Sequence, residues 1–221
     1  MKQYYKAYDE RYRTIHAKGF SWAGSESTPV ILEKLKQYDI GKTDPVLEIG
    51  CGEGRDAVAV LKAGYRLLAT DVSPEAISYC RKSFPEYAGS FEVMDCLETD
   101  SREKFRAIFS VAIIHMLLHD SDRDGFYSFI RDHLTDDGIA VVCSMGDGET
   151  EFRTDENDAF KLKERSHFSG KVMVAGTSCR MVSSETFSKE IERNGLAIIE
   201  QGLTSALPDF DSMLYAVIAK G

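Results

Sequence analysis

The sequence predicts an α/β fold, with a doubly wound, mostly parallel sheet of seven strands and helices on both faces. Strand-like and helix-like segments alternate after residue 28, which is typical of successive β–α–β units. Residues 107–113 are almost wholly apolar, as expected for a central strand that is covered on both faces. A glycine-rich turn follows the first strand at residues 46–49, and it predicts a sharp connection from strand to helix.

The chain length of 221 residues is sufficient for one α/β domain with a full core. We therefore expect a single domain over residues 1–221, with an N-terminal lid segment at 1–28 and an irregular insertion at 146–180. The net charge of −9 argues against nucleic acid or an anionic membrane as a partner, because both bind basic surfaces.

The N-terminus is polar and lacks the apolar core of a signal peptide. No apolar run approaches the length of a transmembrane helix. The five cysteines are dispersed and form no C-x-x-C pair. These features predict reduced thiols in a cytoplasmic protein.

The remaining elements follow from local patterns. Thr28-Pro29 begins the first helix of the α/β unit, since proline is tolerated in a first turn. Strands are expected at 46–49, 66–70, 91–94, 107–113, 139–144, 197–200 and 213–219. Helices are expected at 56–62, from Ser73-Pro74, at 122–133 and at 184–193. Gly64 is placed to end the helix before it. Residues 146–180 are polar and aperiodic, which predicts an irregular insertion or lid.

The turn itself has the sequence VLEIGCGEGRD over residues 46–56. Gly50, Gly52 and Gly54 alternate, so the backbone can turn with positive φ or approach a ligand closely. The helix that follows offers unpaired N–H groups to a ligand. A dinucleotide site requires G-x-G-x-x-G, whereas this chain has Arg55 at the third glycine position. Glu48 near the strand end favours a cationic ligand over a diphosphate.

These residues resemble motif I of the class I methyltransferases that depend on S-adenosylmethionine (SAM). The resemblance implies a Rossmann-like methyltransferase fold, with SAM as the cofactor. It implies that Glu48, Gly50, Cys51 and Gly52 surround the methionine part of SAM, which is cationic at its amino group and sulfonium. A glycine-rich turn that only connects strand to helix is the alternative.

Asp71 follows the second strand, 23 residues after Glu48. A carboxylate at about this distance from a glycine turn binds a ribose diol. The alternative is that Asp71 or Ser73 caps the helix at Pro74.

The resemblance also assigns the adenine end of the cofactor. Asp95 after the third strand is expected to accept a hydrogen bond from the adenine amino group, and the backbone N–H of Cys96 to reach the ring. Val72 is expected to pack on the adenine, and Ala112 at the end of the fourth strand to contact the cofactor. The alternative for Asp95 is an ordinary turn residue.

Aromatic residues are concentrated near the N-terminus. Tyr4, Tyr8 and Tyr12 fall on one helical stripe, with Trp22 nearby. Packing is the expected role of Tyr4, whereas Tyr12 and Trp22 are candidates to hold the sulfonium by cation–π attraction. The YDERY…W character and the GRD after motif I resemble the tellurite-resistance and thiopurine methyltransferase group.

His115 and His119 follow the fourth strand in the sequence HMLLH. No third ligand accompanies them, so no metal site is predicted. His115 is a candidate general base, because its ordinary pKa suits neutral pH. A packed histidine is the alternative. No [DNS]-P-P-[YFW] sequence follows the fourth strand, which argues against the usual exocyclic-amine methyltransferases.

The predicted function is transfer of a methyl group from SAM to a small-molecule nucleophile. Arg153, Arg165, His167 and Arg180 in the insertion are candidates to bind an acidic group of the acceptor. An NAD-dependent oxidoreductase and a non-catalytic SAM-binding module are the alternatives.

Overall fold

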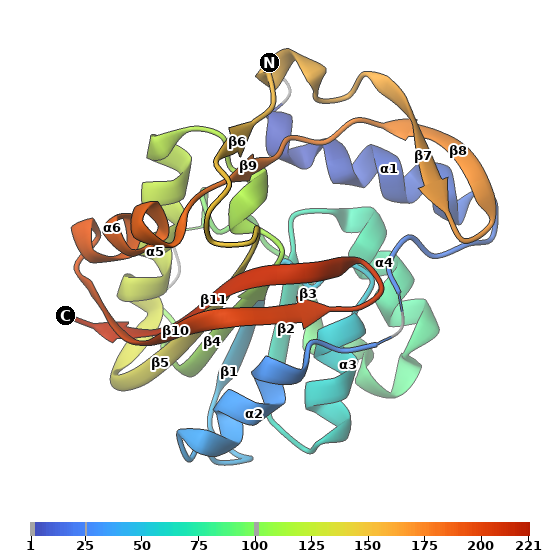
Figure 1. Ribbon diagram of the computed structural model, residues 1–221. Coiled ribbons are helices and arrows are strands. Elements are labelled where there is room, and N and C mark those ends of the chain that lie inside the picture. Colours follow the sequence, from blue (N-terminus) through green and yellow to red (C-terminus); the bar gives the residue numbers. More distant parts are fainter. Residues whose placement is uncertain (1–2, 25, 100–101) are drawn as a thin grey trace.

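A seven-stranded sheet forms the centre of the computed structural model, which describes residues 3–24, 26–99 and 102–221 (Figure 1). The strands are β1 (Val46–Ile49), β2 (Leu67–Asp71), β3 (Phe91–Val93), β4 (Phe105–Val111), β5 (Leu134–Met145), β10 (Leu196–Ala206) and β11 (Phe210–Lys220). Their order across the sheet is β3-β2-β1-β4-β5-β11-β10. The first five are parallel, and β11 is antiparallel to both of its neighbours. The predicted fold class is confirmed.

Helices cover both faces of this sheet (Figure 1). They are α2 (Pro29–Gln37), α3 (Arg55–Lys62), α4 (Pro74–Ser83), α5 (Asp120–His133) and α6 (Ser184–Arg193). One apolar core joins α2, α3 and α4 to the sheet, and a second core joins α5 and α6 to the opposite face. Neighbouring residues of β1 alternate between the cores, with Val46 in the first and Leu47 in the second. A strand buried on both faces requires this continuous apolar sequence.

Local sequence sets where several helices begin. Ser73 accepts a hydrogen bond from the Ala76 N–H (3.1 Å) and caps α4, with Pro74 in the first turn. Ser183 caps α6 in the same way through the Thr186 N–H (3.2 Å). Ser73, rather than Asp71, therefore provides the cap that was the alternative role for both residues.

The N-terminal segment forms the short 3₁₀ helix η1 (Tyr4–Lys6) and helix α1 (Ala7–His16). Residues 1–2 and 25 of the expected lid segment lie outside the described residues. Tyr4 is buried, and its hydroxyl donates to Asp122 and accepts from the Leu118 N–H (2.9 Å). This contact fixes the beginning of the chain against α5.

The stretch 146–180, expected to be irregular, contains strands. β7 (Leu162–His167) and β8 (Gly170–Ala175) form a hairpin, while β6 (Phe152–Arg153) pairs with β9 (Arg180–Met181). Val172 and Val174 of β8 pack on Ile15 of α1, together with Trp22. Helix α1 and the hairpin consequently lie side by side at one end of the sheet (Figure 1). The expectation of irregular structure was wrong for this hairpin, since its outer face is exposed and polar and gives no clear apolar alternation.

Two strands are also longer than expected. β5 begins at Leu134, directly after α5, rather than at residue 139. β10 spans eleven residues instead of four and lies at the edge of the sheet. No helix of the described residues has the length and apolarity needed to cross a membrane.

Candidate functional site

A cavity of about 1060 Å³ lies at the carboxyl ends of β1, β2, β3 and β4, next to α1 and the β7–β8 hairpin. All of the predicted cofactor-binding residues and His115 line it. They are Tyr12, Trp22, Glu48, Gly50, Cys51, Gly52, Asp71, Val72, Asp95, Cys96, Ala112 and His115. Carboxyl ends of parallel strands meet at one edge of a sheet, so residues far apart in sequence converge there.

The glycine turn forms the floor of this cavity. Gly50, Gly52 and Gly54 have φ values of +78°, +52° and +85°. A Cβ on Gly50 would lie 2.1 Å from Cδ1 of Ile113, and one on Gly52 would lie 2.8 Å from the Tyr12 hydroxyl. Both positions therefore require glycine for backbone conformation and for space.

Two buried acids stand beside the turn. Asp71 accepts the N–H of Gly52 and the N–H of Ser73, each at 2.8 Å. Burial raises the pKa of Asp71 to about 6, although these two N–H groups oppose the shift. Burial also raises the pKa of Glu48, whose Oε2 is buried and has no partner among the described residues. An orphaned buried acceptor of this kind fits a ligand that donates a hydrogen bond or carries positive charge.

Asp95 is already engaged by the N-terminal segment. Its Oδ2 lies 2.8 Å from Nζ of Lys6 and accepts the Tyr5 hydroxyl at 3.1 Å, and its Oδ1 accepts the Leu97 N–H at 3.0 Å. Any bond from an adenine amino group would share this carboxylate with η1.

Glu53 connects the turn to the N-terminal segment, a role that was not predicted. Its carboxylate accepts the N–H of Trp22 (2.7 and 2.8 Å) and the N–H of Ala23 (2.7 Å). His16 lies between Glu53 (2.7 Å) and Glu75 of α4 (2.8 Å). The only sequence signal was the position of Glu53 between two of the glycines.

His115 lies in η3 (Ile114–Met116), directly after β4. Burial lowers the pKa of His115 to about 4, with a further contribution from the Arg123 charge. Its Nδ1 is buried without a partner among the described residues, and its ring lies edge-on to Phe210 at 5.9 Å. The imidazole is therefore neutral at pH 7, and the residue lines the cavity.

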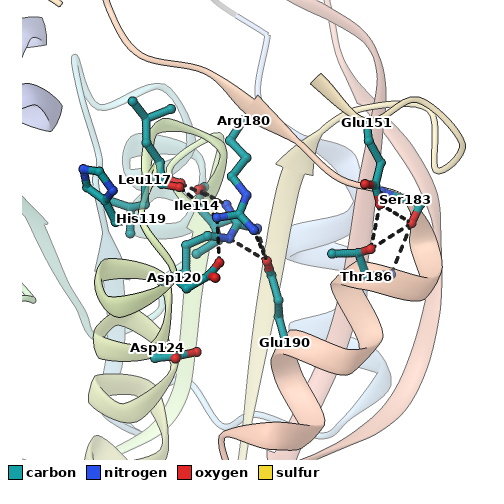
Figure 2. Close-up of polar contacts among 12 residues, drawn as sticks. Ile114, Leu117, His119, Asp120, Asp124, Glu151, Arg180, Ser183, Thr186 and Glu190 are labelled. Carbon is teal, nitrogen blue, oxygen red and sulfur yellow. Dashed lines mark hydrogen bonds and ion pairs between the residues drawn. The ribbon is translucent and has the colours of Figure 1, made fainter. Parts of the chain in front are cut away.

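The backbone around His115 is fixed from several sides. Arg123 donates to the carbonyl oxygens of Ile114 (2.6 Å) and Leu117 (3.3 Å), and it forms a fully buried ion pair with Glu190 of α6. Figure 2 shows Arg180 reaching the same Glu190 between α5 and α6. Ser178 donates to the Met116 carbonyl at 2.6 Å.

The four predicted acceptor anchors divide into two groups. Arg165 and His167 line the cavity, whereas Arg153 and Arg180 do not. Arg180 bonds to the Leu118 carbonyl (2.8 Å) and pairs with Asp120 (2.7 Å), so its charge is used to hold the fold (Figure 2). Arg153 contacts the His119 ring instead. The prediction for these two residues was wrong: their chain neighbours Phe152, Thr154 and Cys179 line the cavity, but the two arginines do not.

Residues 46–138 match a family model described as a methyltransferase domain, and the match begins at β1 and includes the glycine turn. The predicted resemblance to SAM-dependent methyltransferases is confirmed, since residues 46–138 match the methyltransferase domain and solved SAM-dependent methyltransferases share the fold. One structure of similar fold, the glycopeptide N-methyltransferase MtfA, was solved in complex with SAM.

Solved methyltransferase structures share the fold. One is the 1,6-didemethyltoxoflavin-N1-methyltransferase of Burkholderia thailandensis, with a TM-score of 0.70 and 14% identity over 100% of this chain and 91% of that chain. Another is a TehB-like SAM-dependent methyltransferase of Corynebacterium glutamicum, with a TM-score of 0.56 and 21% identity over 98% of this chain and 97% of that chain.

One curated sequence is also similar. It is the ribosomal RNA small subunit methyltransferase A of Parabacteroides distasonis, 34% identical over 73 residues. The similar region is 33% of this methyltransferase and 27% of that protein. The match therefore covers about a quarter of the relative's length.

The residues of this methyltransferase fit SAM on three observations. Side chains at Gly50 and Gly52 would fill space beside the turn. Asp71 stands at the end of β2 with carboxylate oxygens that bond only to backbone N–H groups. Glu48 has a buried oxygen without a partner among the described residues. Space beside the turn would admit the amino-acid end of SAM, the Asp71 carboxylate would accept hydrogen bonds from ribose hydroxyls, and Glu48 would accept one from the amino group.

Binding of S-adenosylhomocysteine should weaken in acid if Asp71 accepts the ribose hydroxyls. The folded pKa of Asp71 is raised to about 6, so the carboxylate protonates as pH falls through that value and loses acceptor strength. In the limit where only the carboxylate binds, affinity falls about tenfold per pH unit below that point. Calorimetry from pH 5 to 8 measures the effect.

Asp71→Asn should bind more weakly and flatten this pH dependence. The exposed variant Asp136→Asn serves as a control and should retain the wild-type profile. The same acid-dependent loss in Asp71→Asn would remove Asp71 as its cause.

Proposed function

We propose that this protein transfers a methyl group from SAM to a small-molecule nucleophile bound in the cavity. The observation that carries the proposal is that the glycine turn, Glu48 and His115 line one cavity. Glu48 and His115 each also have a buried polar atom without a partner among the described residues. A small acceptor is favoured over nucleic acid because the net charge is −9 and because α1 and the hairpin lie beside the cavity.

The cofactor contacts are proposed as follows. Asp71 binds the ribose hydroxyls, and Glu48 faces the amino group of the methionine part. Gly50, Cys51 and Gly52 allow close backbone approach. The remaining contacts are Val72, Asp95, Cys96 and Ala112 along the strand ends, and Tyr12 and Trp22 from the N-terminal segment.

When bound, SAM would supply a methyl group bonded to a positively charged sulfur. A nucleophile in line with that bond takes the methyl carbon, and the sulfur leaves with the bonding electrons as S-adenosylhomocysteine. The protein's part is to orient the nucleophile and exclude water, since the electrophile is already activated. The aromatic faces of Tyr12 and Trp22 stabilise positive charge at the cavity wall. We propose that the chain acts as one domain over residues 1–221, in which segments 1–28 and 146–180 cover the cavity.

Dispersed thiols favour a cytoplasmic location.

Calorimetry with SAM, S-adenosylhomocysteine and NAD tests the pocket. Micromolar binding of the first two, without NAD binding, is expected. Tight NAD binding would instead support an oxidoreductase, although Arg55 occupies the position where such a site has glycine. A panel of thiols, amines, phenols and carboxylates is then screened for release of S-adenosylhomocysteine. Cofactor binding without turnover on any class would favour a non-catalytic module.

His115→Gln is expected to lower kcat by about 10²-fold while leaving S-adenosylhomocysteine affinity within about twofold, the effect typical of a lost proton acceptor. At pH 7 the imidazole is unprotonated and can accept a proton, but a pKa of about 4 makes it a weaker base than the ordinary histidine expected from the sequence. Rates on the best acceptor from the panel provide the measurement. His119→Gln, which removes an exposed ring paired with Glu156, is the matched control and should retain full activity. Equal rates in both variants would make His115 a packing residue.

A further inference from the structure

Arg11 is a buried cation without an acidic partner among the described residues. The residue is only 3% exposed, and its side chain lines the cavity. Nε and Nη2 donate to the Ala175 carbonyl at 3.1 and 2.9 Å, and Nη2 also donates to the Thr177 hydroxyl at 3.1 Å. The guanidinium carbon lies 4.6 Å from each of the Tyr8 and Trp22 ring centroids. All of these contacts are with neutral groups.

The acids that line the cavity have other partners. Glu53 binds Trp22, Ala23 and His16; Asp56 binds Thr28 and Arg55; Asp71 binds Gly52 and Ser73; Asp95 binds Tyr5, Lys6 and Leu97; Asp158 binds Lys161 and Lys163; Asp209 binds Gly24 and Arg55. Glu48 is the other acid among the described residues that line the cavity. Burial raises the pKa of Glu48, which favours its neutral form. None of these carboxylates forms an ion pair or hydrogen bond with Arg11 among the described residues.

A second guanidinium faces the same cavity. Arg165 of β7 lines it and forms no ion pair with any described residue. Burial lowers the pKa of Arg11, and repulsion from Arg165 lowers it further. The neighbouring Lys163 is neutralised by Asp158 at 2.9 Å. The cavity is therefore lined by two guanidinium groups, 154 positions apart in the chain, that form no ion pair with any described residue.

A buried charge is costly unless an opposite charge or a strong hydrogen-bond partner accompanies it. We propose that Arg11 and Arg165 form a subsite for an anionic group of the carboxylate class, carried by a molecule bound in the cavity. The inference rests on the proposed methyl transfer for its choice of ligands. A guanidinium suits this role because its planar fork of donors matches a carboxylate.

Two bound molecules can supply that carboxylate: the amino-acid end of the cofactor, and the methyl acceptor. Titration with S-adenosylhomocysteine and with 5′-methylthioadenosine, which lacks the amino-acid end, tests the first source. Titration of the S-adenosylhomocysteine complex with benzoate and with its neutral counterpart benzamide tests the second. Benzoate is chosen because Tyr8 and Trp22 provide aromatic surfaces next to Arg11.

Arg11→Met and Arg165→Gln are compared with wild type in both titrations. We expect each substitution to weaken carboxylate binding, by about tenfold or more for Arg11→Met, as is typical when a desolvated charge pair is broken. Arg165→Glu, which reverses the exposed charge, should weaken it further than Arg165→Gln. Lys171→Gln lies on the same hairpin, outside the cavity, and serves as the control.

A loss confined to S-adenosylhomocysteine, with 5′-methylthioadenosine unaffected, assigns the anion to the cofactor. A loss confined to benzoate assigns it to the acceptor. Wild-type affinity for both carboxylates in Arg11→Met and in the Arg165 variants would overturn the subsite, and so would equal binding of benzoate and benzamide by the wild type. Should Arg11→Met fail to fold, Arg11→Lys and the exposed Arg165 variants decide the question. Failure of the wild type to bind S-adenosylhomocysteine is a separate result, because it overturns the proposed function itself.

Discussion

Replacing Gly50 with alanine should abolish cofactor binding and destabilise the fold. The new Cβ would lie 2.1 Å from Cδ1 and 2.3 Å from Cγ1 of Ile113, at a backbone φ of +78°. The left-handed conformation costs about 1–2 kcal/mol for an L-residue, and overpacking adds about 1–3 kcal/mol. Ile113 also lines the cavity, so relieving the clash by moving this side chain changes the space next to the turn.

Gly64→Ala is a matched control for this effect. Gly64 has a φ of +87°, but an added Cβ would meet no atom within 4 Å. Its substitution should therefore show the conformational cost alone and leave cofactor affinity unchanged. Urea unfolding and calorimetry with S-adenosylhomocysteine measure both quantities. If Gly50→Ala binds S-adenosylhomocysteine as tightly as Gly64→Ala does, the glycine turn does not contact the cofactor.

Glu190→Ala should cost about 3–5 kcal/mol of unfolding free energy, because it leaves the guanidinium of Arg123 buried and uncompensated. Both side chains of this pair are fully buried, with Nε to Oε1 at 2.8 Å and Nη2 to Oε2 at 2.5 Å. Arg193 and Asp124 join the same two helices at 2.7 Å but are partly exposed. Arg193→Met should therefore cost no more than about 1 kcal/mol in urea unfolding.

The double variant Arg123→Met/Glu190→Leu separates stability from positioning. An apolar pair of similar volume often replaces a buried ion pair without loss of stability. It cannot donate to the carbonyl oxygens of Ile114 and Leu117, which flank His115. We expect unfolding free energy to recover relative to Glu190→Ala while kcat stays low. Full recovery of both quantities would show that the Arg123 donors do not position His115.

The sheet could be predicted because several of its strands contain a short apolar run, such as residues 46–49 before Gly50 and residues 67–70 before Asp71. Burial on both faces produces such runs, and residues 107–113 are the clearest case. The β7–β8 hairpin could not be predicted, because β7 exposes Leu162, Glu164 and Arg165 to solvent and only β8 contributes buried valines. Its stability depends on α1, which is distant in sequence.

Some residues of the candidate site could likewise be predicted from local sequence, whereas others depend on partners that are distant in the chain. The predicted residues at the strand ends line one cavity, since motif spacing and parallel topology fix where they meet. Arg11 and Glu53 were missed because their importance lies in their partners. An arginine in an amphipathic N-terminal helix is ordinarily solvated, and nothing in its local sequence indicates that Ala175 and Thr177 will bury it. Arg153 and Arg180 were predicted to bind the acceptor, but they bind other parts of the chain, and their local sequence does not indicate those partners.

The packing of α1 on the hairpin has a consequence for how ligands would reach the cavity. Ile15 and Trp22 lie against Val172 and Val174, so separating the helix from the hairpin would expose an apolar patch to water. Moving both together would keep that patch covered and break mainly polar contacts, such as those of Asp95 with Lys6 and of Glu53 with Trp22. Hydrophobic contact thus joins helix α1 to the hairpin, whereas ionic and hydrogen-bonded contacts hold the N-terminal segment to the strand ends.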